Sequence, residues 1–128
     1  MIICMEFDGV LISDEVPFDV VDSTKYRMLR GARDGLASLR RAGHTLILSS
    51  TRASRALRDG PHAERKASYD LHEARFQAML SFVQRELPGV FTTIDDGSSG
   101  KISADLYLDR RTPHGMMPWS LIAARYGE

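Results

Sequence analysis

Two carboxylates follow a short apolar run near the start of the chain. The run Ile2–Met5 has the length of a strand, and Glu6 and Asp8 come after it, two residues apart. Residues two apart in a strand point to the same face, so both carboxylates converge if the strand extends to them. Gly9 then allows a sharp turn with a positive φ. Convergent carboxylates suit divalent-metal binding and acid–base chemistry, and the alternative is a solvated acidic turn.

Polar residues also follow the other apolar runs of the chain. We predict strands at Ile2–Met5, Thr45–Leu48, Val90–Ile94 and Leu106–Leu108. The polar residues after the last three runs are Ser49, Ser50, Thr51, Arg52, Asp95, Asp96, Asp109, Arg110 and Arg111. Ligands of parallel α/β sheets bind outside the carboxyl ends of the strands, which makes these residues the candidates for a site.

Helical patterns separate or follow the predicted strands. One runs from Met28 to Leu39, with Asp22 or Ser23 as N-cap, and Gly43 ends it in a left-handed turn. A second is expected from about Asp70 to Leu87, closed by Pro88-Gly89, and a third from Pro118 to near Gly127. Strands alternating with helices predict a mostly parallel sheet. Because the strands are apolar without clean alternation, we expect helices on both faces: a single three-layer Rossmann-like α/β domain over residues 1–128.

Composition limits the classes of protein to which the chain can belong. It has 128 residues, 43% of them hydrophobic and 27% charged, which fits one soluble globular domain. Seventeen basic residues balance seventeen acidic ones, so net charge favours neither nucleic acid nor a membrane as partner. Cys4 is the single cysteine and is expected to be a buried structural thiol in a reducing compartment. The start of the chain does not resemble a signal peptide, and no apolar stretch has bilayer length, so we expect a cytoplasmic protein.

Two stretches fit no helix or strand. Residues 13–21 are polar and contain Pro17, which predicts a flap over the strand ends. Residues 52–66 form a basic stretch that leaves the second strand directly, and we expect a basic surface loop there. No aromatic residues interleave with these basic residues for base stacking, which disfavours a nucleic-acid partner.

In chain order, the strand-end residues resemble the motifs of the haloacid dehalogenase (HAD) superfamily, whose members are mostly magnesium-dependent phosphohydrolases. The family's first strand ends in D-x-D-G-[TV]-L, and this chain has Glu6 to Leu11, EFDGVL. A Ser or Thr ends the family's second strand, where this chain has Ser50, with Ser49 as the alternative. Lys101 stands in the place of the third motif, and Asp109 in that of the fourth.

The arrangement K-x-x-A-D-x-Y-[IL]-D, with a tryptophan soon after, is similar to that of small bacterial members without a cap domain. All four motifs occur in the family's order over nearly the whole chain. Two positions depart from the pattern. Glu6 stands where the family has its nucleophilic Asp, and Arg110 replaces the second acidic residue of the fourth motif.

The resemblance implies a role for each matching residue. Glu6 would be the nucleophile and Asp8 the general acid and base, while Ser50 and Lys101 hold the phosphoryl oxygens. The implied cofactor is Mg²⁺, bound by Glu6, Asp8 and Asp109. The substrate-binding residues expected around them are Ser49, Thr51, Arg52 and Arg110.

The two departures bear directly on activity. The extra methylene of Glu6 moves its carboxylate by roughly 1 to 1.5 Å, and a misplacement near 1 Å can cost on the order of 100-fold in rate. Arg110 adds a positive charge that weakens metal binding and favours an anion.

Two functions remain open. One is a phosphatase of reduced activity on a small phosphorylated molecule or the phosphorylated end of a larger one. The other is an inactive module that binds a phosphate-bearing ligand or a protein partner. Without a cap the site is open, and a neighbouring subunit of a homo-oligomer could cover it.

Overall fold

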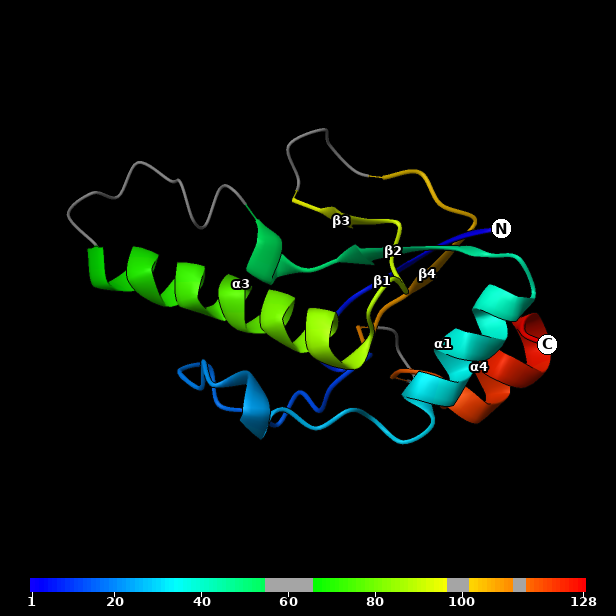
Figure 1. Ribbon diagram of the computed structural model, residues 1–128, viewed down its shortest axis with the longest axis horizontal. Coiled ribbons are helices and arrows are strands. Elements are labelled where there is room, and N and C mark those ends of the chain that lie inside the picture. Colours follow the sequence, from blue (N-terminus) through cyan, green and yellow to red (C-terminus); the bar gives the residue numbers. More distant parts are fainter. Residues whose placement is uncertain (55–65, 97–101, 112–114) are drawn as a thin grey trace.

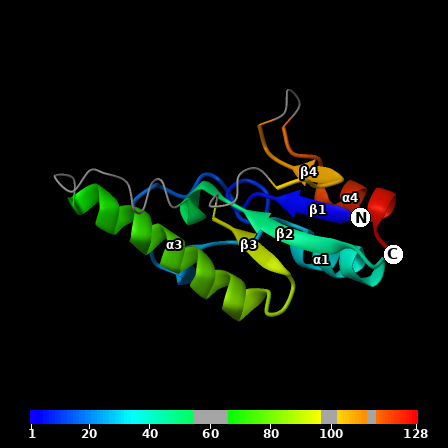
Figure 2. The same cartoon turned by 90° about the horizontal axis from the view of Figure 1, so that it is seen from above.

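The strands form one four-stranded sheet, and all of its strands are parallel. The computed structural model describes residues 1–54, 66–96, 102–111 and 115–128, with the backbone alone for 66–69. The strands are β1 (Ile2–Met5), β2 (Thr45–Ser49), β3 (Thr93–Asp95) and β4 (Leu106–Leu108), in the order β3-β2-β1-β4 (Figure 2). The expected α/β class and parallel sheet are confirmed, and the arrangement is consistent with a Rossmann-like fold.

Three α-helices lie within the described residues. They are α1 (Ala32–Arg41), α3 (Lys66–Glu86) and α4 (Trp119–Tyr126), and two 3₁₀ turns, η1 (Ser23–Lys25) and η2 (Thr51–Ala53), precede α1 and α3. The predicted start of the first helix is wrong. Asp22 caps η1, where its side chain accepts a hydrogen bond from the Thr24 N–H. Helix α1 begins only after Gly31, whose φ of 81° breaks the helical path. No helix in the described ranges is long and apolar enough to span a membrane.

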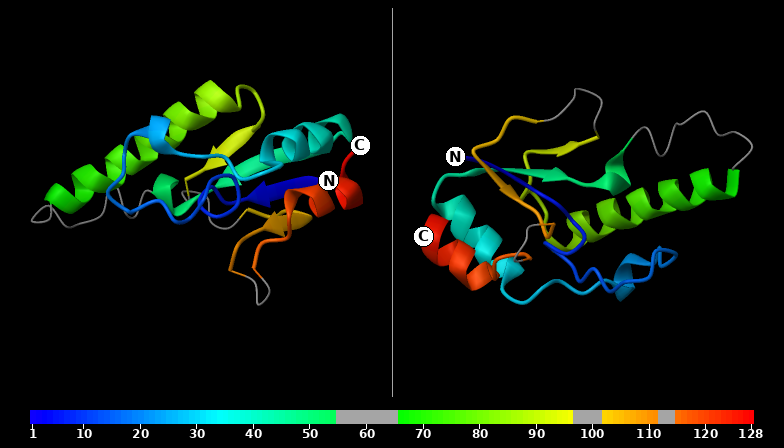
Figure 3. Two further views of the ribbon diagram at one scale, coloured as in Figure 1. Left: turned by 90° about the horizontal axis from the view of Figure 1, so that it is seen from below. Right: turned by 180° about the vertical axis from the view of Figure 1, so that it is seen from behind.

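The hydrophobic core lies on one face of the sheet. Ile3 and Met5 of β1 and Leu46 and Leu48 of β2 point into a single cluster with the helices. The helical members of this cluster are Leu36 and Leu39 of α1, Met79 and Phe82 of α3, and Trp119 and Ile122 of α4. All three helices therefore cover the same face, below the strands in the orientation of Figure 1, and the view from behind agrees (Figures 1 and 3).

The expected helical layer on the other face is not found among the described residues. Cys4, on the opposite side of β1 from Ile3, does not belong to the core cluster. Residues 102–105 cross this face without forming a helix, and the Tyr107 hydroxyl donates a hydrogen bond to the carbonyl of Ile102. The physical reason is length: the β3–β4 connection comprises only residues 96–105, whereas parallel strands joined through a helix need about a dozen or more. Among the residues that the structure describes, two layers are present in place of the expected three.

A tight turn carries the chain away from the end of β1. The carbonyl of Phe7 accepts backbone hydrogen bonds from Leu11 and Ile12, and Gly9 has the expected positive φ, 80°. The carbonyl of Val10 in the same turn accepts a hydrogen bond of 2.8 Å from the indole of buried Trp119. The turn that follows the two carboxylates is thus fixed to α4.

Candidate functional site

Asp8 is held by a buried arginine. Its carboxylate accepts two hydrogen bonds of 2.8 Å from Arg52, one from Nε and one from Nη2. The Arg52 side chain is 1% exposed and that of Asp8 is 20% exposed. The guanidinium carbon lies 5.1 Å from the ring centre of Phe7 and 4.9 Å from that of Tyr26, and Nη1 donates to the Tyr26 hydroxyl. Both Asp8 oxygens are therefore committed to one bidentate, charge-assisted pair.

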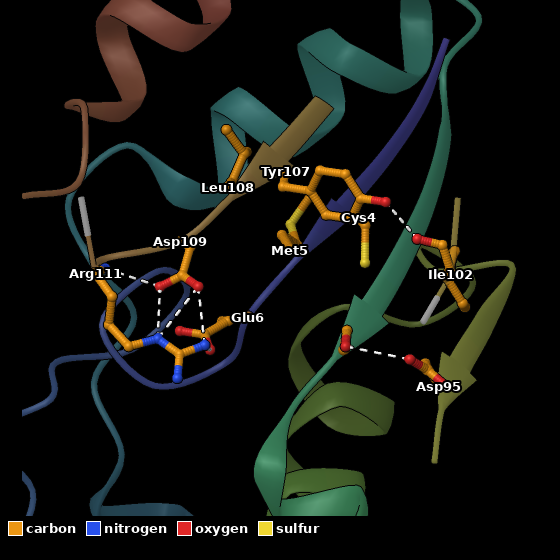
Figure 4. A pocket seen from close by; sticks show the side chains of 10 residues that line it. Cys4, Met5, Glu6, Asp95, Ile102, Tyr107, Leu108, Asp109 and Arg111 are labelled. Carbon is orange, nitrogen blue, oxygen red and sulfur yellow. Dashed lines mark hydrogen bonds and ion pairs between the residues drawn. The ribbon is translucent and has the colours of Figure 1, made fainter. Parts of the chain in front are cut away.

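Glu6 belongs to a separate network with Asp109 and Arg111. Arg111 donates to Glu6 at 2.6 Å and, through Nε and Nη2, to Asp109 at 2.9 to 3.2 Å. Its backbone N–H also donates to Asp109, at 2.8 Å. Figure 4 shows the three side chains turned toward one another at the ends of β1 and β4. The Arg111 guanidinium thus joins the two carboxylates that the resemblance assigns to metal binding.

The pKa values of the two carboxyl groups in this network are shifted in opposite directions. Burial and the neighbouring charge of Asp109 raise the pKa of Glu6, while Arg111 opposes the rise. The hydrogen bond from the Arg111 side chain lowers the pKa of Asp109, against a smaller effect of burial. A proton entering this pair therefore goes to Glu6, which reduces the negative charge at the site.

The two networks meet at one cavity of about 270 Å³. Glu6 and Asp8 both line it, although β1 ends at Met5, before either of them, and they pair with different arginines. The other lining residues are Asp14, Val16, Phe18, Ser50, Thr51, Arg75, Arg110 and Arg111. Three of these belong to the 13–21 segment, which agrees with the expected flap over the strand ends. Arg110 pairs with Asp14 at 3.3 Å, between two exposed side chains.

The two candidate serines make different contacts. Ser50 accepts a hydrogen bond of 3.2 Å from the Arg52 N–H and so caps η2. This is a local turn contact, although Ser50 also lines the cavity. Ser49 donates to Asp95 at 3.4 Å and faces the other side of the sheet. Lys101, expected to hold a phosphoryl oxygen, and most of the basic stretch 52–66 lie outside the described residues.

A second cavity, of about 370 Å³, lies on the face without helices. It is lined by Cys4, Ser49 and Asp95 toward β3 and by Glu6, Asp109 and Arg111 toward β4 (Figure 4). Cys4 is 4% exposed, which confirms the expected burial, and burial raises the pKa of its thiol. Since no helix covers this face in the described residues, Tyr107 and Ile2 stay 44% and 40% exposed.

The residues expected to bind Mg²⁺ do not fit the ion in this arrangement. Oxygens of Glu6 and Asp109 accept hydrogen bonds from the Arg111 guanidinium, and the Asp8 carboxylate is paired with Arg52. Across the described ranges, no group of three or more His, Cys, Asp or Glu side chains is placed to bind a metal ion. The donor set is satisfied by two arginines, and a hard cation would have to displace one of them.

Five residues that line the cavity are not among the site residues predicted from the sequence. Arg111 is a strand-end residue without a predicted role, and Asp14, Val16, Phe18 and Arg75 are not singled out by the pattern. The i, i+2 spacing of Asp109 and Arg111 is a local signal that could have suggested their pairing. Arg75 and Phe18 come from a helix and a flap far apart in the chain, and no local pattern connects them.

Comparisons of the chain with family models, with curated proteins and with solved structures give no match. The strand-end motifs and the two ion-pair networks are therefore the features of the chain that bear on its function.

Proposed function

We propose that the chain is a HAD-like domain that binds a phosphate-bearing ligand at the carboxyl-end edge of its sheet without hydrolysing it. The observation that carries this proposal is the bidentate pair of Asp8 with buried Arg52. The family reaction needs this carboxyl group to give a proton to the leaving group and later to take one from water. Both Asp8 oxygens accept charge-assisted hydrogen bonds from Arg52, so a leaving group or a water would have to compete with this buried arginine for them.

Arginines around the 270 Å³ cavity support anion binding. Arg110 is paired with Asp14 across an exposed contact of 3.3 Å, a kind of pair that contributes little to stability and exchanges partners readily. Arg75 lies 4.0 Å from Asp8, whose charge Arg52 already neutralises at 2.8 Å. Arginine forks bind phosphate oxygens in pairs, so Arg75 and Arg110 give an incoming phosphate two suitable partners.

The second candidate function is a phosphohydrolase of reduced activity. The closeness of Glu6 and Asp109 favours it, because the positions that correspond to the family's nucleophile and its fourth-motif acid stay side by side. The extra methylene of Glu6 and the arginine between the two carboxylates both act against this candidate.

Hydrolysis of an aryl phosphate tests the choice between the two functions. Wild type and Asp8→Asn are assayed with saturating Mg²⁺ and with EDTA, and circular dichroism checks that the variant is folded. We expect the wild type to show no metal-dependent turnover above that of Asp8→Asn. Turnover that needs Mg²⁺ and disappears in a folded Asp8→Asn protein would overturn the proposal in favour of the phosphohydrolase.

Calorimetric titration with inorganic phosphate tests the anion site directly. We expect the wild type to bind phosphate and Arg110→Gln to bind it at least several-fold more weakly. Arg33→Gln is the matched control, because Arg33 is also exposed and ion-paired, to Glu86 at 2.9 Å, but does not line the cavity. No binding by the wild type, or equal loss in both variants, would contradict an anion site at this cavity.

A further inference from the structure

Phe18 is an exposed aromatic residue at the edge of the proposed phosphate site. It belongs to the flap segment 13–21, is 52% exposed, and lines the same cavity as Arg110 and Arg111. What sets this ring apart from other exposed apolar side chains is its place beside the arginines that line the cavity.

Two residues of α3 contact the ring of Phe18. The Arg75 guanidinium carbon lies 3.9 Å from the ring centre, and its Nη1 donates 2.6 Å to the Phe18 carbonyl. His72 meets the ring edge-on, with 5.7 Å between ring centres and 86° between planes. Two residues of α3 thus support a ring whose exposed surface remains available for stacking, in the manner of proteins that hold bases on aromatic side chains.

We propose that the phosphate-bearing ligand is a free mononucleotide, whose phosphate binds among the cavity arginines and whose base stacks on Phe18. This inference rests on the proposed function and adds the class of ligand. A cavity of about 270 Å³ lies near the lower end of small-molecule sites, so it suits the phosphate and pentose while the base lies over the ring at its edge. A phenylalanine ring stacks on the face of a base and makes no hydrogen bond to its edge, so the site should accept different bases.

Calorimetric titrations with AMP, ribose 5-phosphate and inorganic phosphate, all without Mg²⁺, separate the contributions of base, sugar and phosphate. Base–aromatic stacking predicts that the wild type binds AMP roughly 5- to 150-fold more tightly than ribose 5-phosphate. Phe18→Leu keeps an apolar side chain but removes the ring, and we expect it to bind both ligands equally. Phe18→Trp should retain the preference for AMP. Titration of each variant with inorganic phosphate reports separately whether its phosphate site is intact.

Leu121→Ala is the matched control, since Leu121 is 55% exposed on α4 and does not line the cavity. It should preserve the preference for AMP. If phosphate binds but AMP gains nothing over ribose 5-phosphate, or if Phe18→Leu keeps the gain, the nucleotide inference is wrong and the phosphate site stands. If none of the three ligands binds, the proposed function fails and this inference fails with it. Tighter binding of a 5′-phosphorylated trinucleotide than of AMP would overturn the choice of a free nucleotide.

Discussion

The carboxylate of Asp8 and the guanidinium of Arg52, 44 residues apart in the chain, form a bidentate pair with two bonds of 2.8 Å. Arg52 is the more deeply buried partner, and its remaining hydrogen bonds go to the Tyr26 hydroxyl and the Arg75 carbonyl. The residue that the family resemblance assigns to proton transfer is therefore part of a structural network between the first two strands and α3.

Arg52→Ala is expected to destabilise the protein strongly. Removing one partner of a buried pair leaves the other charge uncompensated, which typically costs about 3 to 5 kcal/mol in the free energy of unfolding. Arg33→Ala removes an exposed pair with Glu86 and should cost far less. Urea unfolding of the two variants measures the difference. Equal, small losses would show that the Asp8–Arg52 pair does not hold the fold together.

Gly35→Ala should destabilise the protein although alanine is the better helix former by about 1 kcal/mol. A Cβ at position 35 would lie 2.5 Å from Cε3 of Trp119, where α1 packs against α4. A double-mutant cycle with Trp119→Leu, followed by thermal or urea unfolding, isolates this contact. We expect a coupling between the two changes, because Gly35→Ala is tolerated once the ring is gone. Additive effects would contradict the close approach of the two helices.

The Cys4 thiol should react slowly with alkylating reagents in the native protein. It is 4% exposed and burial raises its pKa above the ordinary value, so little thiolate is present near pH 8. Alkylation by iodoacetamide, followed by mass spectrometry, should become fast in urea, where the chain is unfolded. Equal rates in native buffer and in urea would place Cys4 at an open surface.

Mg²⁺ is not expected to raise the melting temperature of the wild type beyond the effect of NaCl at equal ionic strength. The Arg111 guanidinium already bridges Glu6 and Asp109, so a cation would have to displace it before it could bind these carboxylates. Arg111→Gln leaves two adjacent carboxylates and should melt at a lower temperature that Mg²⁺ partly restores. Arg33→Gln, which lowers the charge equally elsewhere, should show no such recovery. A rise specific to Mg²⁺ in the wild type would contradict this arrangement.

Glu6→Gln should change how stability depends on pH. The pKa of Glu6 is raised above 4.5 in the folded protein, so its protonated form stabilises the fold below that pH. This contribution is lost as pH rises through the folded pKa, because the unfolded chain releases the proton first. The stability of wild type relative to Glu6→Gln should therefore fall as pH rises above about 4.5, as measured by urea unfolding. A difference that rises with pH would reverse the assigned direction.

The strand pattern and the turn glycines were predictable because their signals are local. Ile2–Met5 and Leu106–Leu108 have the predicted bounds, and Gly9 and Gly43 adopt the positive φ expected of them. The predicted start of the first helix is wrong because a residue such as Asp22 can cap a 3₁₀ turn as well as an α-helix. The third strand begins at Thr93 rather than Val90, after the chain leaves α3 through Gly89.

The sequence by itself determined which polar residues come to the carboxyl-end edge of the sheet, since apolar runs followed by charges can be read along the chain. Only the tertiary structure decided their partners. The sheet order β3-β2-β1-β4 brings β1 between β2 and β4, so Asp8 meets Arg52 after β2 while Glu6 meets Arg111, 105 residues away, after β4. Ion pairs between such distant residues depend on the order of the strands in the sheet, and no local pattern of residues determines that order.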